Sequence, residues 1–463
     1  MTLANEATLV LDIGKTNVKL VLVDVDGAVL AERRSPNTIL TGAPYPHHDT
    51  DRIWHWLLDG MAQLSSVARI GAIVSVTHGA TAALVDDDGL VLPVLDYEFE
   101  PPAEEGERYA DQRPPYSSTY SPRLPAGLNL GRQLVWQARC FPFQFGRARH
   151  ILMYPQYWAW RLCGVAASEV TSLGCHTDLW QPSRQQYSAL VERMGWNDFF
   201  PPIQPAWATL GALKPELAQQ TGLPADCRVL CGIHDSNASL LRHFALADDR
   251  QGAALPAVLS TGTWVIAAAP GKPLDGLREA GDMLANSNAM GQAVACMRFM
   301  GGREFAELAG AEAQVCGIDD LRSLIASQTM ALPCFSQAGG PFAGRAGAII
   351  GAAPKNSQQR YALATLYCVL MSDYCLTQLG VDGGVVVEGS YTGNPWFAPL
   401  LAALRPRQQI SSTDDASGTT CGGWMLHHWG SAPAVRSTVA TPLELPGWTE
   451  YRQRWLANVA ATA

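Results

Sequence analysis

The stretch that decides the fold is TLVLDIGKTNVKLVLVD, residues 8–24, in which two apolar runs flank a short polar turn. The runs 8–13 and 18–24 have the length and the apolar side chains of buried strands. The turn Gly14-Lys15-Thr16-Asn17 carries the glycine and short polar side chains that tight turns use. The sequence therefore predicts a β-hairpin at the start of the chain.

A second segment repeats this device about half a chain later. Residues 257–271 read AVLSTGTWVIAAAPG, so an apolar strand leads into the turn Thr261-Gly262-Thr263 and a second apolar strand follows. Each hairpin presents a glycine turn flanked by hydroxyl side chains. The duplication predicts two related domains that face a shared cleft, spanning residues 1–241 and 242–463.

The first turn has two features that suit a phosphate group. Gly14 lets backbone N–H groups come close to an anion, and Lys15 adds a positive point charge. Many β-hairpins use the same residue types for turn geometry alone. The pairing of two such turns, with Asp12 just before the first, favours phosphate binding.

A third segment, Gly232-Ile233-His234-Asp235-Ser236, closes the short apolar strand 228–231 and opens an Ala/Leu-rich helix from residue 237. It places the Asp235 carboxylate at the rim of a sheet, where open α/β folds hold their ligands. A carboxylate held there by a glycine turn can accept a proton from a bound hydroxyl. The alternative is that Asp235 simply caps the following helix.

One further strand and two helices in the N-terminal half continue an α/β pattern. Residues 70–76 predict a buried strand that ends at the bend Thr77-His78-Gly79, a place where ligands are commonly held. Helical patterns follow in residues 128–138 and 154–162. The fold class predicted from these elements is α/β.

Two further segments have compositions of their own. Residues 100–127 are rich in proline and predict a long, poorly regular excursion, such as a binding loop or lid. Near the C-terminus, the strand 383–387, the polar turn 388–394 and the helix 395–404, with a proline in its first turn, suit a nucleotide.

Composition excludes several function classes. The chain has 463 residues, of which 48% are hydrophobic and 16% charged, so it can bury a large core. Its net charge of −9 gives no basic surface for nucleic acid. We expect a soluble, cytoplasmic protein with no membrane partner, because a basic leader and long apolar stretches are both missing. Eleven cysteines without a Cys-x-x-Cys pair predict no disulfide framework.

The order of these motifs resembles the FGGY family of carbohydrate kinases, in the actin-like ATPase superfamily. The resemblance implies two ribonuclease H-like domains, each a mixed sheet flanked by helices, with the active site in the interdomain cleft. Five segments carry it, namely a first phosphate motif, a catalytic turn, a second phosphate motif, an adenosine motif and a glycine-containing helix near the nucleotide: residues 11–17, 232–235, 260–263, 388–394 and 419–423.

Within the family, residues 75–86, 92–98 and 124–131 resemble a bacterial branch of L-rhamnulose and L-fuculose kinases. Two departures stand out. Many members have Gly-Thr-Thr in the first phosphate turn, where this chain has Gly14-Lys15-Thr16. Many also carry a Trp-x-Asp-x-Arg sugar motif, whereas Leu95-Asp96-Tyr97-Glu98 lacks both the Trp and the Arg. The second departure leaves the identity of the sugar open.

The resemblance implies a role for each candidate site residue. Asp235 would be the catalytic base, and Asp12 would hold Mg²⁺ through its water shell. The expected phosphate contacts are Gly14, Lys15, Thr16, Asn17, Thr261, Gly262 and Thr263. Gly389 and Asn394 would border the adenosine. The expected sugar contacts are His78, Asp96, Asn129, His234 and Asp235.

The reaction implied is transfer of the ATP γ-phosphoryl group to a ketose hydroxyl, at carbon 1 of L-rhamnulose or L-fuculose. L-Ribulose and D-xylulose are the alternative sugars. The predicted ligands are therefore ATP, Mg²⁺ and a sugar; the oligomeric state is open, with a homodimer as one option.

Structural alternatives and other function classes remain at this stage. His78, His234 and Asp96 could be satisfied core residues, Asp12 a turn acceptor and Asn129 a helix cap. A non-catalytic actin-like nucleotide sensor would keep both phosphate hairpins but would not need a carboxylate at Asp235. A nicotinamide-dependent oxidoreductase is disfavoured, because no Gly-x-Gly-x-x-Gly follows the first strand.

Overall fold

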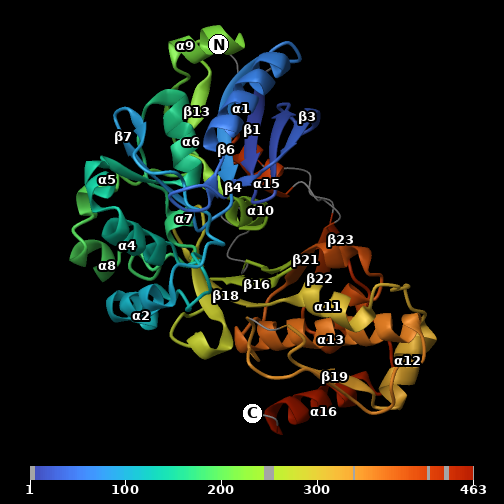
Figure 1. Cartoon of the computed structure of the whole chain (residues 1–463). Helices are drawn as coiled ribbons and strands as arrows, with labels where there is room; N and C mark the ends of the chain where they lie inside the picture. Colours follow the sequence, from blue (N-terminus) through green and yellow to red (C-terminus); the bar gives the residue numbers. More distant parts are fainter. Residues whose placement is uncertain (1–5, 245–254, 337–338, 414–417, 432–436, 462–463) are drawn as a thin grey trace. The chain divides into compact units, whose positions relative to one another are not determined.

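The computed structural model describes residues 6–244, 255–336, 339–413, 418–431 and 437–461, and they belong to two compact units (Figure 1). Unit 1 contains Met1–Arg250, Ala285–Ala293 and Ser417–Ala434; unit 2 contains Gln251–Leu284, Val294–Ala416 and Val435–Ala463. Two short segments of the C-terminal half thus contribute to unit 1. The division at residues 241 and 242 stays a prediction.

The main sheet of unit 1 confirms the first predicted hairpin. Its strand order is β12-β13-β6-β1-β2-β3, and β14 also pairs with β6. Strand β1 is antiparallel to β2 and parallel to β6, so Asp12 lies opposite Lys19 on one side and Val76 on the other. The strands are β1 Ala7–Ile13, β2 Asn17–Val23, β3 Val29–Pro36, β6 Ile70–Thr77, β12 Thr209–Ala212, β13 Arg228–Leu230 and β14 Ile233–His234.

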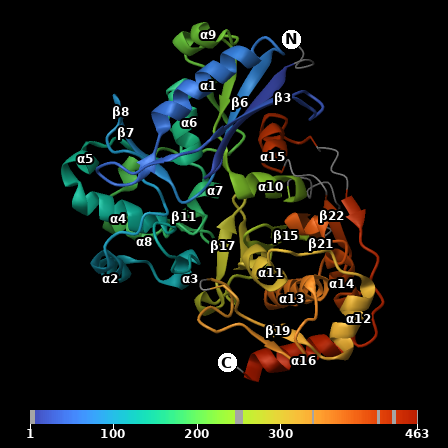
Figure 2. The same ribbon diagram turned by 45° about the vertical axis from the view of Figure 1, so that its right-hand side comes forward.

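Both faces of this sheet are covered, which explains why its central strands are apolar without alternation. Leu9, Leu11 and Ile13 of β1 pack with α1 and α6 in one core cluster. Val10, from the same strand, belongs to a second cluster with α10 and α15. Figure 2 shows α1 and α15 on opposite sides of the β1–β6 region.

In the described part of unit 1, eleven helices surround this sheet and three smaller sheets. The helices are α1 Thr50–Leu64, α2 Ala103–Gln112, α3 Tyr116–Thr119, α4 Leu130–Cys140, α5 Pro142–Arg147, α6 Tyr154–Cys163, α7 Val170–Leu173, α8 Ala189–Arg193, α9 Pro215–Thr221, α10 Asp235–Phe244 and α15 Gly418–His427. The short strands are β4 Ile39–Leu40, β5 His47–His48, β7 Ala82–Asp86, β8 Gly89–Leu90, β9 His150–Met153, β10 Trp180–Gln181 and β11 Gln186–Tyr187.

The prediction for residues 100–127 was wrong in one respect, because the segment is partly regular. It contains α2 and α3, each of which begins directly after a proline, at Pro102 and Pro115. A proline at that position removes no helical hydrogen bond, so a proline-rich composition does not exclude short helices.

The second large sheet lies mostly in unit 2 and has seven strands in the order β17-β18-β16-β15-β21-β22-β23. Its centre repeats the arrangement of unit 1: β15 is antiparallel to β16 and parallel to β21, which confirms the second hairpin. The strands are β15 Ala257–Thr261, β16 Val265–Pro270, β17 Met283–Ser287, β18 Ala293–Phe299, β21 Val385–Gly389, β22 Ile410–Thr413 and β23 Ser437–Val439, with β19 Met330–Leu332 and β20 Ala348–Ile350 in a separate pair.

The helices of unit 2 stack in layers away from this sheet. In both views α13 lies between the sheet and α16 (Figures 1 and 2). The helices are α11 Gly301–Ala309, α12 Ile318–Ala326, α13 Ser357–Gln378, α14 Phe397–Leu404 and α16 Trp448–Ala461. Helix α14 begins two residues after the predicted Pro395. Among the helices so described in both units, none is long and apolar enough to cross a membrane.

Candidate active site

The turn that carries Asp235 is built by tight backbone packing in unit 1. Gly232 has φ +86°, and a Cβ there would collide with the Ser75 carbonyl oxygen on β6, so only glycine fits. The Gln156 side chain donates to the carbonyl oxygens of Cys231 and Gly232 at 3.1 and 3.2 Å. Strand β14 then pairs with β6, and α10 starts at Asp235. Helix α10 therefore begins two residues before residue 237, where the sequence predicted its start.

The Asp235 carboxylate is not bonded as a helix cap. Its Oδ1 accepts from the N–H of Ser236, the next residue, at 2.6 Å. An N-cap side chain accepts instead from the second or third residue beyond it. The side chain keeps 30% of its surface exposed, which leaves room for a ligand group to reach it.

Burial and two charged or polar neighbours, His78 and Asp12, are the main influences on the pKa of Asp235. Burial raises its pKa from the usual 3.8 to about 6, the nearby His78 lowers it, and the negative charge of Asp12 raises it further. A pKa near 6 suits a proton acceptor that works close to neutral pH.

His234, beside Asp235, is a buried residue with a set orientation. Its backbone N–H donates to Thr171 Oγ1 at 3.1 Å, and its Nδ1 accepts from the Asn237 side chain at 3.1 Å. The proton of the neutral ring is therefore on Nε2, which lies 3.2 Å from Asp235 Oδ1. Burial lowers the pKa of His234 to about 4, so the ring stays neutral.

Glu169 is linked to the Asp235 turn through Thr171, and it was not predicted from the sequence. Its two carboxylate oxygens accept from the N–H and the hydroxyl of Thr171, at 3.0 and 2.5 Å. Thr171 in turn receives the backbone N–H of His234. Glu169 is fully buried, and burial raises its pKa to about 7.

The predicted bend at His78 meets the turn that carries Asp235. Thr77 pairs with His234 across β6 and β14, and a Cβ at Gly79 would lie 2.9 Å from His234 Nε2. His78 Nδ1 lies 3.0 Å from the Gly79 carbonyl oxygen, so Nδ1 carries the proton and Nε2 is an acceptor. That Nε2 is buried and has no hydrogen-bond partner in the described chain. It is an acceptor available to a ligand hydroxyl.

Asp12 lies at the end of β1 with two partners. Its Oδ2 accepts from Thr419 Oγ1 at 2.9 Å and lies 3.3 Å from Lys19 Nζ. Lys19 could have been found in the sequence, because it sits opposite Asp12 across the hairpin. Thr419, 407 residues away, gave no such signal. Thr419 lies on α15, which belongs to unit 1 although it comes late in the sequence.

The turn 14–17 is closed by its own backbone and by one side chain. Gly14 N–H donates to the Asn17 carbonyl at 2.9 Å. Asn37 donates its backbone N–H to the Thr16 carbonyl and its side-chain amide to the Gly14 carbonyl, at 2.9 and 2.8 Å. Thr16 and Asn17 are exposed, and the Asn17 side-chain amide donates to the Thr16 hydroxyl at 3.1 Å. Asn37 was not predicted.

Lys15 and Asp96, predicted for different ligands, contact each other. Lys15 Nζ forms an ion pair with Asp96 Oδ1, lies 3.3 Å from Glu98 Oε2 and stands 4.7 Å from the centre of the Tyr97 ring. The Tyr97 ring also meets the edge of His78, with ring centres 5.4 Å apart. These contacts place Lys15 and Asp96 in the cluster around Asp235.

Asn129 is buried and already well bonded. It occupies the N-cap position of α4 without capping it. Its Oδ1 accepts from Leu124 N–H at 2.9 Å, and its Nδ2 donates to the carbonyls of Pro122 and His176 at 3.0 and 3.1 Å. Only the second lone pair of Oδ1 is left for a sugar.

In unit 2, the predicted second phosphate motif and the predicted adenosine motif meet. Thr261 pairs with Gly389 between β15 and β21. The Thr261 hydroxyl donates to the Glu388 carbonyl at 2.5 Å and accepts from Tyr391 N–H at 2.9 Å. Gly389 has φ +86°, and a Cβ there would collide with the Thr261 backbone. The two motifs form one rigid edge.

The start of α11 adds to this edge, and the sequence analysis did not identify it. Gly302 N–H donates to the Thr263 carbonyl at 3.2 Å, and a Cβ at Gly302 would collide with the Gly262 carbonyl. The N-terminus of a nine-residue helix is thereby held against an exposed turn. Free N–H groups at a helix N-terminus attract anions.

Asn394 has little hydrogen-bonding capacity left. Its Nδ2 donates to Thr365 Oγ1 at 2.9 Å, and its Oδ1 accepts from Trp396 N–H at 3.0 Å. In the structure this residue secures the turn before α14.

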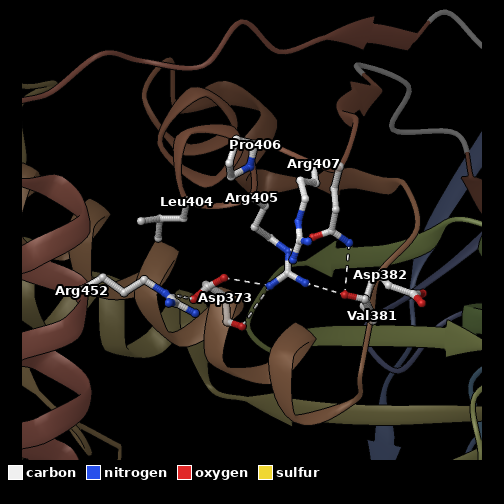
Figure 3. Close-up of a pocket in the computed structure, with 9 residues that line it drawn as sticks. Asp373, Val381, Asp382, Leu404, Arg405, Pro406, Arg407 and Arg452 are labelled. Carbon is white, nitrogen blue, oxygen red and sulfur yellow. Dashed lines mark hydrogen bonds and ion pairs between the residues drawn. The ribbon is translucent and has the colours of Figure 1, made fainter.

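A separate cavity of about 610 Å³ in unit 2 is lined by charged residues, and three of them, Asp373, Arg405 and Arg452, pair with one another (Figure 3). Arg405 donates to Asp373 Oδ1 at 2.8 Å and to the Val381 carbonyl at 2.7 Å. Arg452 approaches the same carboxylate from the other side, at 2.5 Å. Its groups therefore brace α13 against α16 and are not candidates for the site.

The donor set near Asp12 fits a water-held Mg²⁺ and no tighter metal site. Across the described ranges, no group of three or more His, Cys, Asp or Glu side chains could hold a metal ion. Mg²⁺ needs only one or two carboxylates, since it keeps several waters. Asp12 Oδ1 has no hydrogen-bond partner among the described residues, and the charge of Asp12 already raises the pKa of Asp235. A cation beside these carboxylates would relieve that repulsion.

Comparison with known proteins covers nearly the whole chain. The profile for the FGGY family of carbohydrate kinases, N-terminal domain, matches residues 7–241, and the profile for the C-terminal domain of carbohydrate kinase FGGY matches residues 254–435. The crystal structure of a carbohydrate kinase from Novosphingobium aromaticivorans is 38% identical, with a TM-score of 0.91 and coverage of 99% of both chains. A xylulose kinase from Rhodospirillum rubrum, 20% identical, shares the fold over 99% of this chain and 98% of its own, with a TM-score of 0.78.

Curated relatives match over a shorter region. An L-fuculokinase of Salmonella typhi is 30% identical over 283 residues, and one of Escherichia coli K12 is 26% identical over 279 residues. Each match covers 56% of this chain and 56% of the relative, so the chain matches about half the length of these proteins. Because the N-terminal profile alone covers half of the chain, the protein belongs to the FGGY family of carbohydrate kinases and has the two-domain, actin-like ATPase fold expected from its sequence.

Proposed function

We propose that this protein is an ATP-dependent sugar kinase that transfers the γ-phosphoryl group to a ketose hydroxyl. One observation carries the proposal: the Asp235 carboxylate is partly exposed, has a pKa raised to about 6, and lies in a buried polar cluster with His78 and His234. A nucleotide sensor has no use for a proton acceptor in this position.

Asp235 acts as the proton acceptor. As the sugar oxygen forms its bond to the γ-phosphorus and the bond to the β,γ-bridging oxygen breaks, the hydroxyl proton passes to the carboxylate. The transition state is loose, so the proton moves late and the main task of Asp235 is to orient the hydroxyl. His234 Nε2–H, 3.2 Å from Oδ1, helps to hold the carboxylate in one orientation.

The sugar is recognised by polar groups on the same side of unit 1. His78 Nε2 accepts a hydrogen bond from one sugar hydroxyl, and the Asp96 carboxylate accepts a hydrogen bond from another. Such a site rejects a sugar of the wrong configuration strongly, because a buried polar group would then lose its partner. The similarity to L-fuculokinases supports a 6-deoxy ketohexose, L-fuculose or L-rhamnulose, phosphorylated at carbon 1.

The nucleotide would use backbone groups in both units. In unit 1 the turn 14–17 offers N–H groups and the Thr16 hydroxyl. In unit 2 the turn 261–263 and the start of α11 offer a neutral set of N–H donors, and Gly389 and Asn394 border the adenosine. Asp12 would hold Mg²⁺ through water. When bound, Mg²⁺ neutralises the phosphate charge.

A coupled assay of ADP release tests the proposal. The panel contains L-fuculose, L-rhamnulose, L-ribulose, D-xylulose and the parent aldoses, each with ATP and Mg²⁺. We expect a 6-deoxy ketohexose to give the highest kcat/KM. ATP binding without ADP release in the presence of any sugar would contradict the proposal and favour a sensor. Cytoplasmic location and dimerisation stay predictions.

A further inference from the structure

Lys15 occupies an unexpected place for a residue of a phosphate turn. Its ammonium contacts three groups of one segment: the Asp96 carboxylate, the Glu98 carboxylate and the face of the Tyr97 ring. The side chain is 18% exposed, and that of Asp96 is 8% exposed. The two departures from the common family pattern, at positions 15 and 98, thus meet at a single ammonium group.

The Lys15 ammonium is close enough to two buried histidines, His78 and His48, to influence their pKa values. The positive charge of Lys15 contributes to lowering the pKa of His78 and of His48, although burial is the larger cause in both. His48 stacks on His78, with ring centres 5.1 Å apart. Tyr97 links the two groups, since its ring touches both the ammonium and His78.

The ion pair with Lys15 also helps to fix the orientation of the Asp96 carboxylate. Asp96 Oδ1 accepts from Lys15 and from the Glu98 N–H, the latter at 3.1 Å. Asp96 Oδ2 has no hydrogen-bond partner within the described part of the chain. A buried carboxylate with one oxygen anchored and the other open is a directional acceptor for a hydroxyl.

We propose that Lys15 is a specificity-determining, positioning residue of the sugar site: it orients Asp96 and Tyr97 toward the hydroxyls of a ketose and is not a phosphate ligand. The proposal rests on the proposed function. Its physical basis is charge compensation, because without Lys15 the buried Asp96 carboxylate would lose its cation and would face the exposed Glu98 carboxylate nearby.

The test compares Lys15→Thr, Lys15→Arg and a control, Lys272→Thr. Lys272 pairs with Asp382 at 2.5 Å in unit 2, outside the site, so its replacement also removes a lysine ion pair. We expect Lys15→Thr to raise the sugar KM by about tenfold or more and to change the ATP KM by less than about twofold. Lys15→Arg should retain most of the sugar affinity, and Lys272→Thr should behave as wild type.

A second variant relocates the charge. Lys15→Thr combined with Glu98→Arg supplies a cation near Asp96 from position 98, because the Glu98 side chain already reaches to 3.3 Å from Lys15 Nζ. We expect the double variant to recover at least part of the lost sugar affinity, measured by KM and by calorimetric sugar binding. A merely structural role for Lys15 would not produce this recovery.

The outcomes separate this proposal from the proposed function. Failure of the kinase proposal appears in the wild type, as absent sugar-dependent ADP release. If the wild type is active but Lys15→Thr raises the ATP KM by about tenfold and leaves the sugar KM unchanged, Lys15 is a phosphate ligand and the inference is overturned. An unchanged sugar KM in a folded Lys15→Thr variant overturns it as well.

Discussion

The two glycine turns, 14–17 in unit 1 and 261–263 in unit 2, have the same hairpin topology but opposite surroundings. Charged groups crowd the first turn: Asp12 bonds Lys19 and Thr419, and Lys15 pairs with Asp96. The second turn is held by neutral groups, since the Thr261 hydroxyl bonds two backbone atoms of the Gly389 region. The first turn thus combines backbone groups with ionic side chains. The second combines backbone groups with threonine hydroxyls.

Removing the central charge of unit 1 should have the largest effect. We expect Asp235→Asn to lower kcat by about 100-fold or more, because the amide cannot accept the hydroxyl proton. ATP affinity, measured by calorimetry, should be close to that of the wild type. The control is Asp382→Asn, an exposed carboxylate in unit 2 that bonds Lys272. Near-normal turnover in Asp235→Asn would refute the base assignment.

A second variant removes the buried charge beneath that turn. The pKa of Glu169 is raised from 4.5 to about 7 in the folded protein, so the fold favours the protonated form. Stability is therefore lost as pH rises from about 4.5 through 7, by about 3 kcal/mol in total. We expect Glu169→Gln to be more stable than wild type by about that amount at pH 8, with little difference at pH 5.

Urea unfolding at both pH values measures the effect of Glu169→Gln. The glutamine can still accept the Thr171 N–H, which the carboxylate now receives at 3.0 Å. A difference between the two proteins that does not change with pH would show that Glu169 is ionised in the folded state.

The neutral turn of unit 2 depends on backbone shape, and a single methyl group tests this. Gly389→Ala introduces a Cβ that collides with Thr261 at a φ of +86°, so we expect a loss of about 2 kcal/mol in stability and a raised ATP KM. The matched control is Gly393→Ala, four residues on, where a Cβ meets nothing within 4 Å. Equal behaviour of the two variants would argue against a rigid edge.

The smallest expected effect concerns the bond between Thr419 and Asp12. Thr419→Val keeps the shape but removes the 2.9 Å hydrogen bond, so we expect a loss of about 1 kcal/mol in stability. Thr419→Ser should retain the bond and the stability. If valine and serine were equivalent in urea unfolding, the bond would contribute nothing to the charged turn.

Local patterns predicted much of this molecule. Both hairpins, the strand before His78 and the turn at Asp235 follow from apolar runs that end at glycine, because strand length and turn chemistry are local properties. The helix α2 was missed, since prolines at its start were read as signs of irregular structure.

The side-chain partners were harder to predict. The hairpin register places Lys19 opposite Asp12 and was available from the sequence. The contacts of Lys15 with Asp96 and of Thr419 with Asp12 join residues 81 and 407 positions apart. Nothing local distinguishes them, because they depend on how elements pack in three dimensions.

The position of α15 also affects how the chain matures during synthesis. Its Gly422 and Gly423 pack against Ala238 on α10 and against Val10 and Val76 in the sheet of unit 1. The ribosome must therefore have passed Gly418–His427 before α15 can cover this face of the N-terminal sheet. Until then Asp12 can bond Lys19 in the same hairpin, but it lacks the hydrogen bond from Thr419.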